Sequence, residues 1–337
     1  MTYYYKGSKK QLKSITIPDR YTSIGKHSFS ACNNLFSIII PNSVNAISRF
    51  AFGFCFNLTS ITIPTSITYI GEYAFSDCYN LKSITIPTSV SEINDCTFIN
   101  CFNLTSITIP TSVSKIGCNA FWNCSKLSSV IIPNSVKIIS EGVFCRCYNL
   151  SSIIIPNSVK IISKGVFCRC CNLSSVTIPT SVIYIGEHAF SYCFNLKSIT
   201  IPSSINKIDE HAFDNCSNLT SITIPSSVNK IVQEVFSNCS NLTSITTSDS
   251  ISEIDQEVFS NCSNLTSITT SDSVSEIDQE DFNDCSNLSS THISTYDNEH
   301  NYKTLIQAYE NVLQKHPYLF KEFEKEVLRL DPDFKFE

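Results

Sequence analysis

The residues most able to do chemistry in this sequence are its 17 cysteines, because a thiolate can ligate metals, attack electrophiles or form disulfides. Twelve of them recur every 23 residues, from Cys32 to Cys285. If turns of chain stack in register at this period, neighbouring Cβ atoms lie about 4.8 Å apart, beyond the ~3.8 Å of a relaxed disulfide. Free cysteine also behaves as a small buried hydrophobe. We therefore predict that this column packs in a core.

Five cysteines lie outside that column: Cys96, Cys118, Cys145, Cys168 and Cys171. Cys145 and Cys168 are one period apart, so stacking places them side by side, where two thiols could form a labile disulfide or contribute to a metal site. The repeats around them are near copies, and duplication alone also explains the pair. We predict no bound metal and no cofactor, and the sequence leaves open whether the two thiols interact.

Three histidines, His27, His188 and His211, share one position of the repeat, and the last two follow Glu187 and Glu210. The same position holds other residue types in other repeats: Phe50, Tyr73, Cys96, Asn119, Gly142 and Glu234. Such variety indicates a position that is at least partly exposed to solvent. No nucleophile–base–acid arrangement, phosphate-binding glycine loop or helical His–Glu pair is present. The sequence therefore predicts no catalytic residues and no enzyme.

Proline sets the register of the repeat, with ten prolines spaced 23 residues apart from Pro18 to Pro225. Leucine keeps the same step from Leu12 to Leu288, and phenylalanine keeps it from Phe29 to Phe282. A fixed internal period of this size is the signature of a stacked repeat architecture. The chain is therefore predicted to be a solenoid of about twelve 23-residue repeats.

The repeat from Leu35 to Asn57 indicates how one turn is built. Its alternating pair, Ile38 and Ile40, favours a short strand with one buried face. Pro41 has no N–H to donate and ends that strand. The chain then returns along a tight arc or a short helical turn. About seven side chains of the repeat are predicted to point inward: Leu35, Ile38, Ile40, Val44, Ile47, Phe52 and Cys55.

At this point the residues resemble a known family, the BspA-like leucine-rich repeats. The family pattern appears almost verbatim in residues 63–78, IPTSITYIGEYAFSDC, and the resemblance extends over roughly residues 12–290. It implies an α/β fold, a right-handed leucine-rich-repeat solenoid with a parallel concave sheet, a short helical or irregular convex side and a C-terminal helical cap. It also implies a role in protein binding or adhesion, as in surface antigens that contact host matrix or neighbouring cells.

One column departs from the usual leucine-rich repeat. Where such repeats carry a ladder of asparagines, this chain has Ser43, Ser66, Ser89 and their successors. We expect a ladder of hydroxyl groups that bond the backbone of the turn instead.

The outward face of the predicted strands is almost entirely serine and threonine. One of its columns is all serine, from Ser14 to Ser290. The other supplies our candidate ligand-binding face: Thr62, Thr85, Thr108, Ile131, Ile154, Thr177, Thr200 and Thr223. Threonine suits strands, and copying of the repeat explains the pattern equally well. The functional interpretation is a broad uncharged surface that hydrogen-bonds an extended protein or a glycan, with a small aliphatic patch at Ile131 and Ile154.

Charge is distributed unevenly along the chain. Ten acidic residues and no Lys or Arg lie between Asp249 and Asp284, whereas residues 131–170 carry five basic residues and one Glu. Sequence drift between duplicated, solvent-exposed loops explains this pattern. The alternative is that the acidic end steers a basic partner to the protein. The net charge of −6 and the absence of a basic cluster argue against a nucleic-acid partner.

The expected class of partner follows from the outward Ser/Thr surface together with the resemblance to BspA-like repeats. We expect a monomer that binds a protein, such as a host-matrix or cell-surface protein, or a glycan. No apolar stretch approaches the ~20 residues of a membrane span. The first residues contain no apolar run typical of a secretory signal, which predicts a cytoplasmic protein, whereas the resemblance implies the cell surface.

Three regions are expected. Residues 1–11 form a degenerate first repeat or cap, residues 12–293 the solenoid, and residues 294–337 a helical hairpin. In the last region apolar residues recur at helical spacing on both sides of Pro317. Because a repeat array needs its terminal hydrophobic face covered, this hairpin is expected to cap the solenoid. A partner-docking module, which would make the chain an intracellular scaffold or regulatory adaptor, is the alternative.

Overall fold

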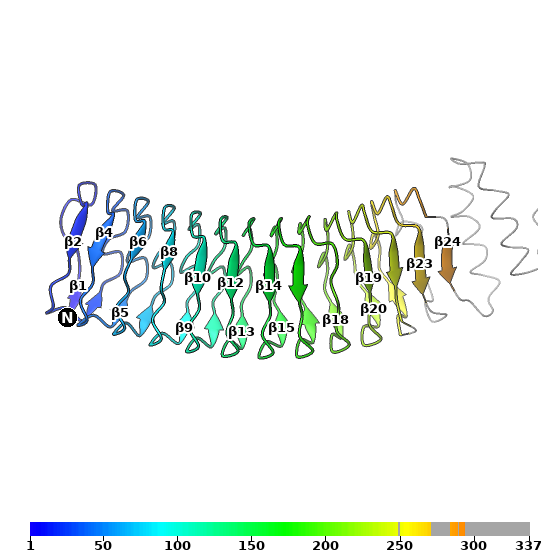
Figure 1. The fold of residues 1–337 in the computed structure, drawn as a ribbon, viewed down its shortest axis with the longest axis horizontal. Helices are drawn as coiled ribbons and strands as arrows, with labels where there is room; N and C mark the ends of the chain where they lie inside the picture. Colours follow the sequence, from blue (N-terminus) through cyan, green and yellow to red (C-terminus); the bar gives the residue numbers. More distant parts are fainter. Residues whose placement is uncertain (249, 271–283, 289, 294–337) are drawn as a thin grey trace, which may run out of the picture. The chain divides into compact units, whose positions relative to one another are not determined.

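The computed structural model describes residues 1–248, 250–270, 284–288 and 290–293. The chain divides into two compact units, Met1–His292 and Ile293–Glu337. The first unit is an elongated, gently bowed solenoid whose turns are stacked side by side (Figure 1). The expected helical hairpin at residues 294–337 lies outside the described residues, as do Asp249 and the acidic residues between 271 and 283.

Most of the described turns carry two short strands, which form two columns along the rod (Figure 1). The first column is interrupted at residues 198–200, which form no strand. The first column contains β2 (Ser14–Thr16), β4 (Ser37–Ile39), β6 (Ser60–Ile61), β8 (Ser83–Ile84), β10 (Ser106–Thr108), β12 (Ser129–Ile131), β14 (Ser152–Ile154), β16 (Ser175–Thr177), β19 (Ser221–Thr223), β21 (Ser244–Thr246), β23 (Ser267–Thr270) and β24 (Ser290–Ile293). The second contains β1 (Thr2–Tyr3), β3 (Ser23–Ile24), β5 (Ala46–Ile47), β7 (Tyr69–Ile70), β9 (Glu92–Ile93), β11 (Lys115–Ile116), β13 (Ile138–Ile139), β15 (Ile161–Ile162), β17 (Tyr184–Ile185), β18 (Lys207–Ile208), β20 (Lys230–Ile231) and β22 (Glu253–Ile254).

The strands of both columns pair in parallel, in the register set by the repeat. Ser106 pairs with Ser129 in the first column, and Lys115 pairs with Ile138 in the second, each 23 residues apart. The protein is therefore a parallel β-solenoid of about twelve turns, as the period of the proline column predicts.

The second strand column corrects the α/β fold class and the helical alternative for the return segment, for which a tight arc was the other expectation. No helix is present in the described residues, and Ile47 lies in β5. The three-residue spacing of Val44 and Ile47 resembles a helical pattern, but its cause is a tight turn. The Val44 N–H donates to the Pro41 carbonyl at 3.1 Å, after which the chain extends again.

The return segment of each turn is a run of overlapping turns that also binds the next repeat. The N–H groups of His27, Phe29 and Ala31 donate to Arg49, Ala51 and Gly53 of the following turn at 3.2, 2.8 and 2.8 Å. Every second N–H group of this segment thus donates to the next turn. The backbone is left-handed at His27 (φ 57°) and Ala31 (φ 60°), and also at the equivalent positions one period later. Two positions per turn therefore adopt a conformation that is unfavourable for residues with a Cβ.

Replacing Ala31 with glycine is expected to stabilise the protein by about 0.5–1 kcal/mol, because relief of the left-handed strain exceeds the added entropy of the unfolded chain. Ala51 is a matched control, since it is fully buried and is not in the left-handed region. Ala51→Gly is expected to destabilise by a similar amount. Urea denaturation of both variants measures the difference, and changes of the same sign would contradict the assignment of strain to Ala31.

The core is one continuous column of side chains along the first unit. All seven predicted inward positions of the Leu35–Asn57 repeat are buried. An eighth buried position, Ala51 and its equivalents, was not expected and holds alanine or valine in most of the described turns. The phenylalanine rings of the core stack from turn to turn, with centroids of Phe98 and Phe121 5.4 Å apart.

The cysteine column is also part of this core, which confirms its predicted packing role. All 17 cysteines are free, and the 12 of the column are buried. Each from Cys55 onward donates a weak S–H hydrogen bond to a phenylalanine carbonyl, as from Cys55 Sγ to Phe29 O at 3.1 Å. Burial raises the pKa of Cys32 to about 11 and that of Cys285 to about 12, so these thiols stay protonated and unreactive.

Two side-chain ladders tie the turns together at the corners. The predicted serine ladder is confirmed in most turns: Ser66 Oγ donates to Val44 O at 2.6 Å, and Ser181 Oγ donates to Val159 O at 2.8 Å. At Ser43 and Ser135 the buried hydroxyl group finds no partner. A second ladder of asparagine amides was not predicted. It precedes the leucine column, and Asn195 donates to Asn172 at 3.1 Å. Both ladders satisfy polar groups that stacking would otherwise leave unpaired.

Candidate binding faces of the solenoid

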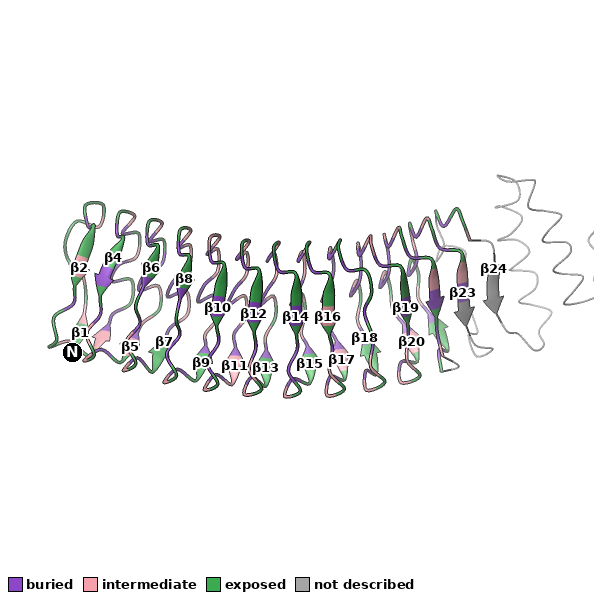
Figure 2. Ribbon diagram, viewed as in Figure 1, coloured by how far each residue is buried: buried purple, intermediate pink, exposed green. Residues whose placement is uncertain are grey.

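The strands of the first column carry the Ser/Thr face, defined as the outward residues on either side of each buried central residue. In β10, Ile107 is buried, while Ser106 and Thr108 point outward. All eight candidate positions, from Thr62 to Thr223, are exposed and lie in one column of the repeat. Figure 2 shows this exposed band along the front strands. The face is uncharged throughout the part of the chain that the structure describes.

The hydroxyl groups of this face are available to a ligand. Within the described residues, Thr108, Thr177 and Thr200 make no side-chain hydrogen bond. The position one residue before the outward serines differs, because its hydroxyl groups are used within the fold, as where Thr243 Oγ1 donates to Thr220 O at 2.9 Å. A ligand lying along the strands would therefore meet a row of unengaged donors and acceptors spaced at about 4.8 Å.

An aliphatic patch interrupts the hydroxyl row in the middle of the rod. Ile131 is 79% exposed and Ile154 71% exposed, on neighbouring turns. Ile131 pairs with Thr108 and Ile154 pairs with Thr177, so the patch is framed by threonines. Aliphatic side chains this exposed gain free energy when a partner covers them.

The outward side of the second column is mixed and differs from turn to turn. Ile138 and Ile161 are exposed, and they lie on the same two turns as Ile131 and Ile154 of the aliphatic patch. Further along, Lys230 Nζ lies 2.7 Å from Glu253 and 2.8 Å from Asp255. The acidic residues predicted to steer a basic partner are thus partly neutralised where the structure describes them. This face lacks the regular chemistry of the Ser/Thr face.

The stacks of partly exposed aromatic rings on the return segments were not predicted from the sequence. His27, Phe50 and Tyr73 form one stack with centroid separations of 4.9 and 4.5 Å. Phe56 and Tyr79 begin a second stack at 4.7 Å, which continues to Phe102. The 23-residue step of these rings was visible, but their position on the turn required the backbone path.

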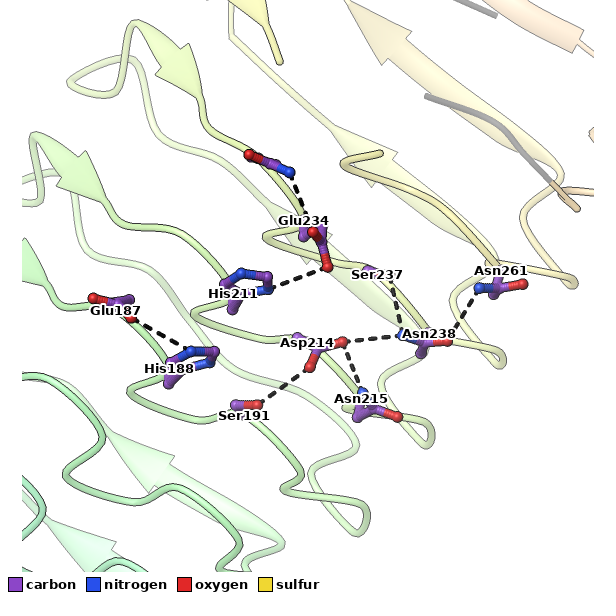
Figure 3. Close-up of polar contacts among 11 residues, drawn as sticks. Glu187, His188, Ser191, His211, Asp214, Asn215, Glu234, Ser237, Asn238 and Asn261 are labelled. Carbon is purple, nitrogen blue, oxygen red and sulfur yellow. Dashed lines mark hydrogen bonds and ion pairs between the residues drawn. The ribbon is translucent and has the colours of Figure 1, made fainter. Parts of the chain in front are cut away.

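His188 and His211 are partly exposed, as predicted for this position of the repeat. Their rings stack with centroids 4.6 Å apart (Figure 3). His188 Nε2 lies 3.4 Å from Glu187, and His211 Nδ1 lies 3.3 Å from Glu234 (Figure 3). Burial, together with the neighbouring His211, lowers the pKa of His188. Cys96, at the same position of another turn, is buried, which departs from the expectation.

A buried carboxylate lies beside this pair. Asp214 accepts hydrogen bonds from Asn215 at 2.8 Å, Asn238 at 3.1 Å and Ser191 at 3.4 Å (Figure 3). These donors satisfy Asp214 within the fold, which fits a structural role. Among the residues that the structure describes, no group of three or more His, Cys, Asp or Glu side chains is arranged to hold a metal ion.

The stacked turns, the leucine and cysteine columns and the exposed strand face define a leucine-rich-repeat solenoid. The chain matches the family described as BspA type leucine rich repeat region (6 copies) over residues 2–128, 91–220 and 206–308. It belongs to this family, as the resemblance in residues 63–78 predicted.

Two solved structures show the same fold. A leucine-rich repeat protein from Bacteroides ovatus is 23% identical, with a TM-score of 0.53 and coverage of 88% of this chain and 87% of that one. The pneumococcal vaccine antigen PcpA is 21% identical, with a TM-score of 0.60 and coverage of 91% and 80%. A leucine rich cell surface protein from Faecalibacterium prausnitzii is 24% identical, with a TM-score of 0.39 and coverage of 90% and 92%.

A search of curated proteins found no match to this chain. Within the ranges that the structure describes, no helix has the length and hydropathy needed to cross a lipid bilayer.

Proposed function

We propose that this protein is a non-enzymatic scaffold for protein binding and adhesion, and that its ligand lies along the Ser/Thr face. The observation that carries the proposal is the aliphatic patch of Ile131 and Ile154, set in a row of unengaged threonine hydroxyls. Membership of a repeat family and the cell-surface description of one similar structure support the same role at a coarser level.

The exposed isoleucines favour a protein ligand over a glycan. A glycan presents many hydroxyl groups and gains little from two aliphatic side chains, whereas an extended peptide can place apolar side chains on the patch. The outward threonines then hydrogen-bond the peptide backbone on both sides. A matrix or cell-surface protein with an extended apolar segment is therefore the proposed partner class.

The test is a matched pair of double variants. Ile131→Thr/Ile154→Thr restores the threonine found in neighbouring turns and is expected to keep the fold but weaken binding at least about tenfold, or ~1.4 kcal/mol. Ile138→Thr/Ile161→Thr removes two exposed isoleucines from the second column of the same turns. Binding of purified protein to immobilised matrix proteins and intact cells is measured by surface plasmon resonance and flow cytometry.

Equal losses in both pairs, or a loss only in the second pair, would rule out the Ser/Thr face as the binding surface. The alternative is an intracellular adaptor that docks a partner through residues 294–337. It predicts that binding survives the Ile131→Thr/Ile154→Thr change and disappears when the sign of charged residues in that region is reversed. Surface labelling of intact cells separates the two compartments.

A further inference from the structure

Two cysteines outside the buried column lie on neighbouring turns. Cys145 and Cys168 occupy the same position of successive repeats, one 23-residue period apart. The backbone holds the turns together at this point: Arg146 N–H donates to Cys168 O at 2.8 Å, and Asn123 N–H donates to Cys145 O at 2.7 Å. The stacking of the turns therefore places Cys145 and Cys168 side by side, as their spacing predicted.

The pair is accessible, unlike the buried cysteine column. Both side chains are partly exposed. In an earlier turn, the Phe50 ring covers the equivalent position, lying 3.0 Å from where a Cβ of Gly53 would be. The residues that correspond to Phe50 are Gly142 and Gly165, both in left-handed backbone. The Asn119 side chain occupies the space beside Gly142, whereas only Cys168 Cβ lies within 4 Å of the position of a Cβ at Gly165. A small molecule can therefore approach the Cys168 thiol from the Gly165 side.

The surroundings make Cys145 the more reactive thiol. A hydrogen bond from the Cys168 thiol lowers the pKa of Cys145, and the Arg146 guanidinium and the Trp122 side chain lower it further, against an opposing effect of burial. The guanidinium itself stacks over the Trp122 ring, 4.9 Å from its centroid. The same hydrogen bond raises the pKa of Cys168, which therefore stays protonated. One thiol is poised as a nucleophile and its neighbour as a proton donor.

We propose that Cys145 and Cys168 form a peroxide-reactive dithiol site that closes to a disulfide between two neighbouring turns. The site is independent of the Ser/Thr face. Its substrate class is a small hydroperoxide such as hydrogen peroxide, which fits the opening beside Gly165.

The chemistry balances without a cofactor. The Cys145 thiolate attacks one peroxide oxygen, so that an S–O bond forms, the O–O bond breaks, and hydroxide leaves and takes a proton as water. Cys145 is then a sulfenic acid. The Cys168 sulfur attacks the Cys145 sulfur, the S–O bond breaks, and the thiol proton leaves with the hydroxide as a second water. Two thiols are oxidised to a disulfide, and one peroxide is reduced to two waters.

The disulfide is expected to be readily reduced. Cβ atoms on neighbouring strands stack about 4.8 Å apart, whereas relaxed disulfides have a spacing near 3.8 Å. The turns must therefore approach each other when the bond forms, and the backbone ladder opposes this movement. Labile disulfides of this kind act in regulation rather than as permanent cross-links.

Trypsin allows a direct test because it isolates each thiol. Cleavage after lysine and arginine releases Cys145 in the peptide of residues 138–146 and Cys168 in the peptide of residues 165–169, and each contains one cysteine. The full chain, reduced and then treated with one equivalent of hydrogen peroxide, is expected to yield these two peptides joined by a disulfide. Thiol reductant should separate them. Absence of the joined peptide, or joining of Cys145 to any other cysteine, would overturn the proposal.

Variants test the assigned roles. In Cys168→Ser, Cys145 lacks its resolving thiol, so sulfenic acid at Cys145 should accumulate and be trapped by a dimedone probe. In Cys145→Ser, Cys168 should remain a thiol. Cys118→Ser removes another partly exposed cysteine and should leave the cross-link unchanged. Equal trapping in Cys145→Ser and Cys168→Ser would contradict the assignment of Cys145 as nucleophile.

A second variant tests access without removing a sulfur. Gly165→Phe places at this left-handed position the residue found there at Phe50, whose φ is 54°. The ring should cover Cys168 and slow disulfide formation severalfold, with circular dichroism unchanged. A rate equal to that of the unmodified chain would show that the opening beside Gly165 does not admit the oxidant.

Discussion

Replacing Phe121 with alanine is expected to lower the free energy of unfolding by about 3–5 kcal/mol. The ring is fully buried and lies between Phe98 at 5.4 Å and Phe144 at 5.7 Å, nearly parallel to both. The cavity cannot close, because the Phe121 N–H donates to Val143 O at 3.0 Å and the backbone ladder fixes the turn spacing. Both neighbouring rings therefore lose a packing surface at once.

Urea denaturation monitored by circular dichroism measures this loss. Thr108→Ala, on the exposed face of the same repeat, is the control and is expected to change stability by less than about 0.5 kcal/mol. Because each turn contacts only its neighbours, a central defect should also broaden the transition as the two halves begin to unfold separately. A loss below about 1 kcal/mol at Phe121 would show that the rings do not form a continuous stack.

The arrangement of columns follows from the sequence because the repeat aligns with itself. Once Pro18, Pro41 and their successors fix the period, every position stacks on its equivalent, so burial in one turn predicts burial in all. The period-two pattern of Ile38 and Ile40 then assigns Ser37 and Ile39 to the outward face. The Ser/Thr face and the serine ladder needed no further information.

The path of the chain between these columns could not be predicted in the same way. Left-handed backbone is usually recognised in a sequence by glycine or asparagine. Here the first left-handed position of the turn holds Phe50, Tyr73 and His188 in different repeats. Their conformation is imposed by hydrogen bonds to the next turn, which a local propensity does not contain. The second strand column was missed for a related reason, since two-residue strands such as β5 are too short to show alternation.

The placement of Cys145 beside Cys168 lies between these two cases. The period predicted that the residues would be neighbours, yet the same argument applied to the buried cysteines, whose thiols bond backbone carbonyls instead. What separates the two sets is that Cys145 and Cys168 are partly exposed. That difference arises from side-chain directions on a left-handed turn, which the sequence pattern does not specify.

Deleting one whole repeat should leave the protein folded, whereas deleting half a repeat should unfold the centre of the solenoid. Removal of residues 131–153 joins Val130 to Ile154 and keeps every column in phase, because the deletion equals one 23-residue period. Each remaining turn still finds an in-register neighbour. The variant is expected to retain its circular dichroism spectrum and one cooperative transition, with stability reduced by the loss of a single turn.

Removal of residues 131–142 instead places Val143 and Phe144 where Ile131 and Ile132 should follow the strand. The seven inward residues of that turn lose their stacking partners, and at ~2 kcal/mol each this costs on the order of 15 kcal/mol, as much as the whole stability of a typical domain. Limited proteolysis should then cut the chain near the junction. If the two deletion variants resist proteolysis equally, register between turns does not determine the stability of the solenoid.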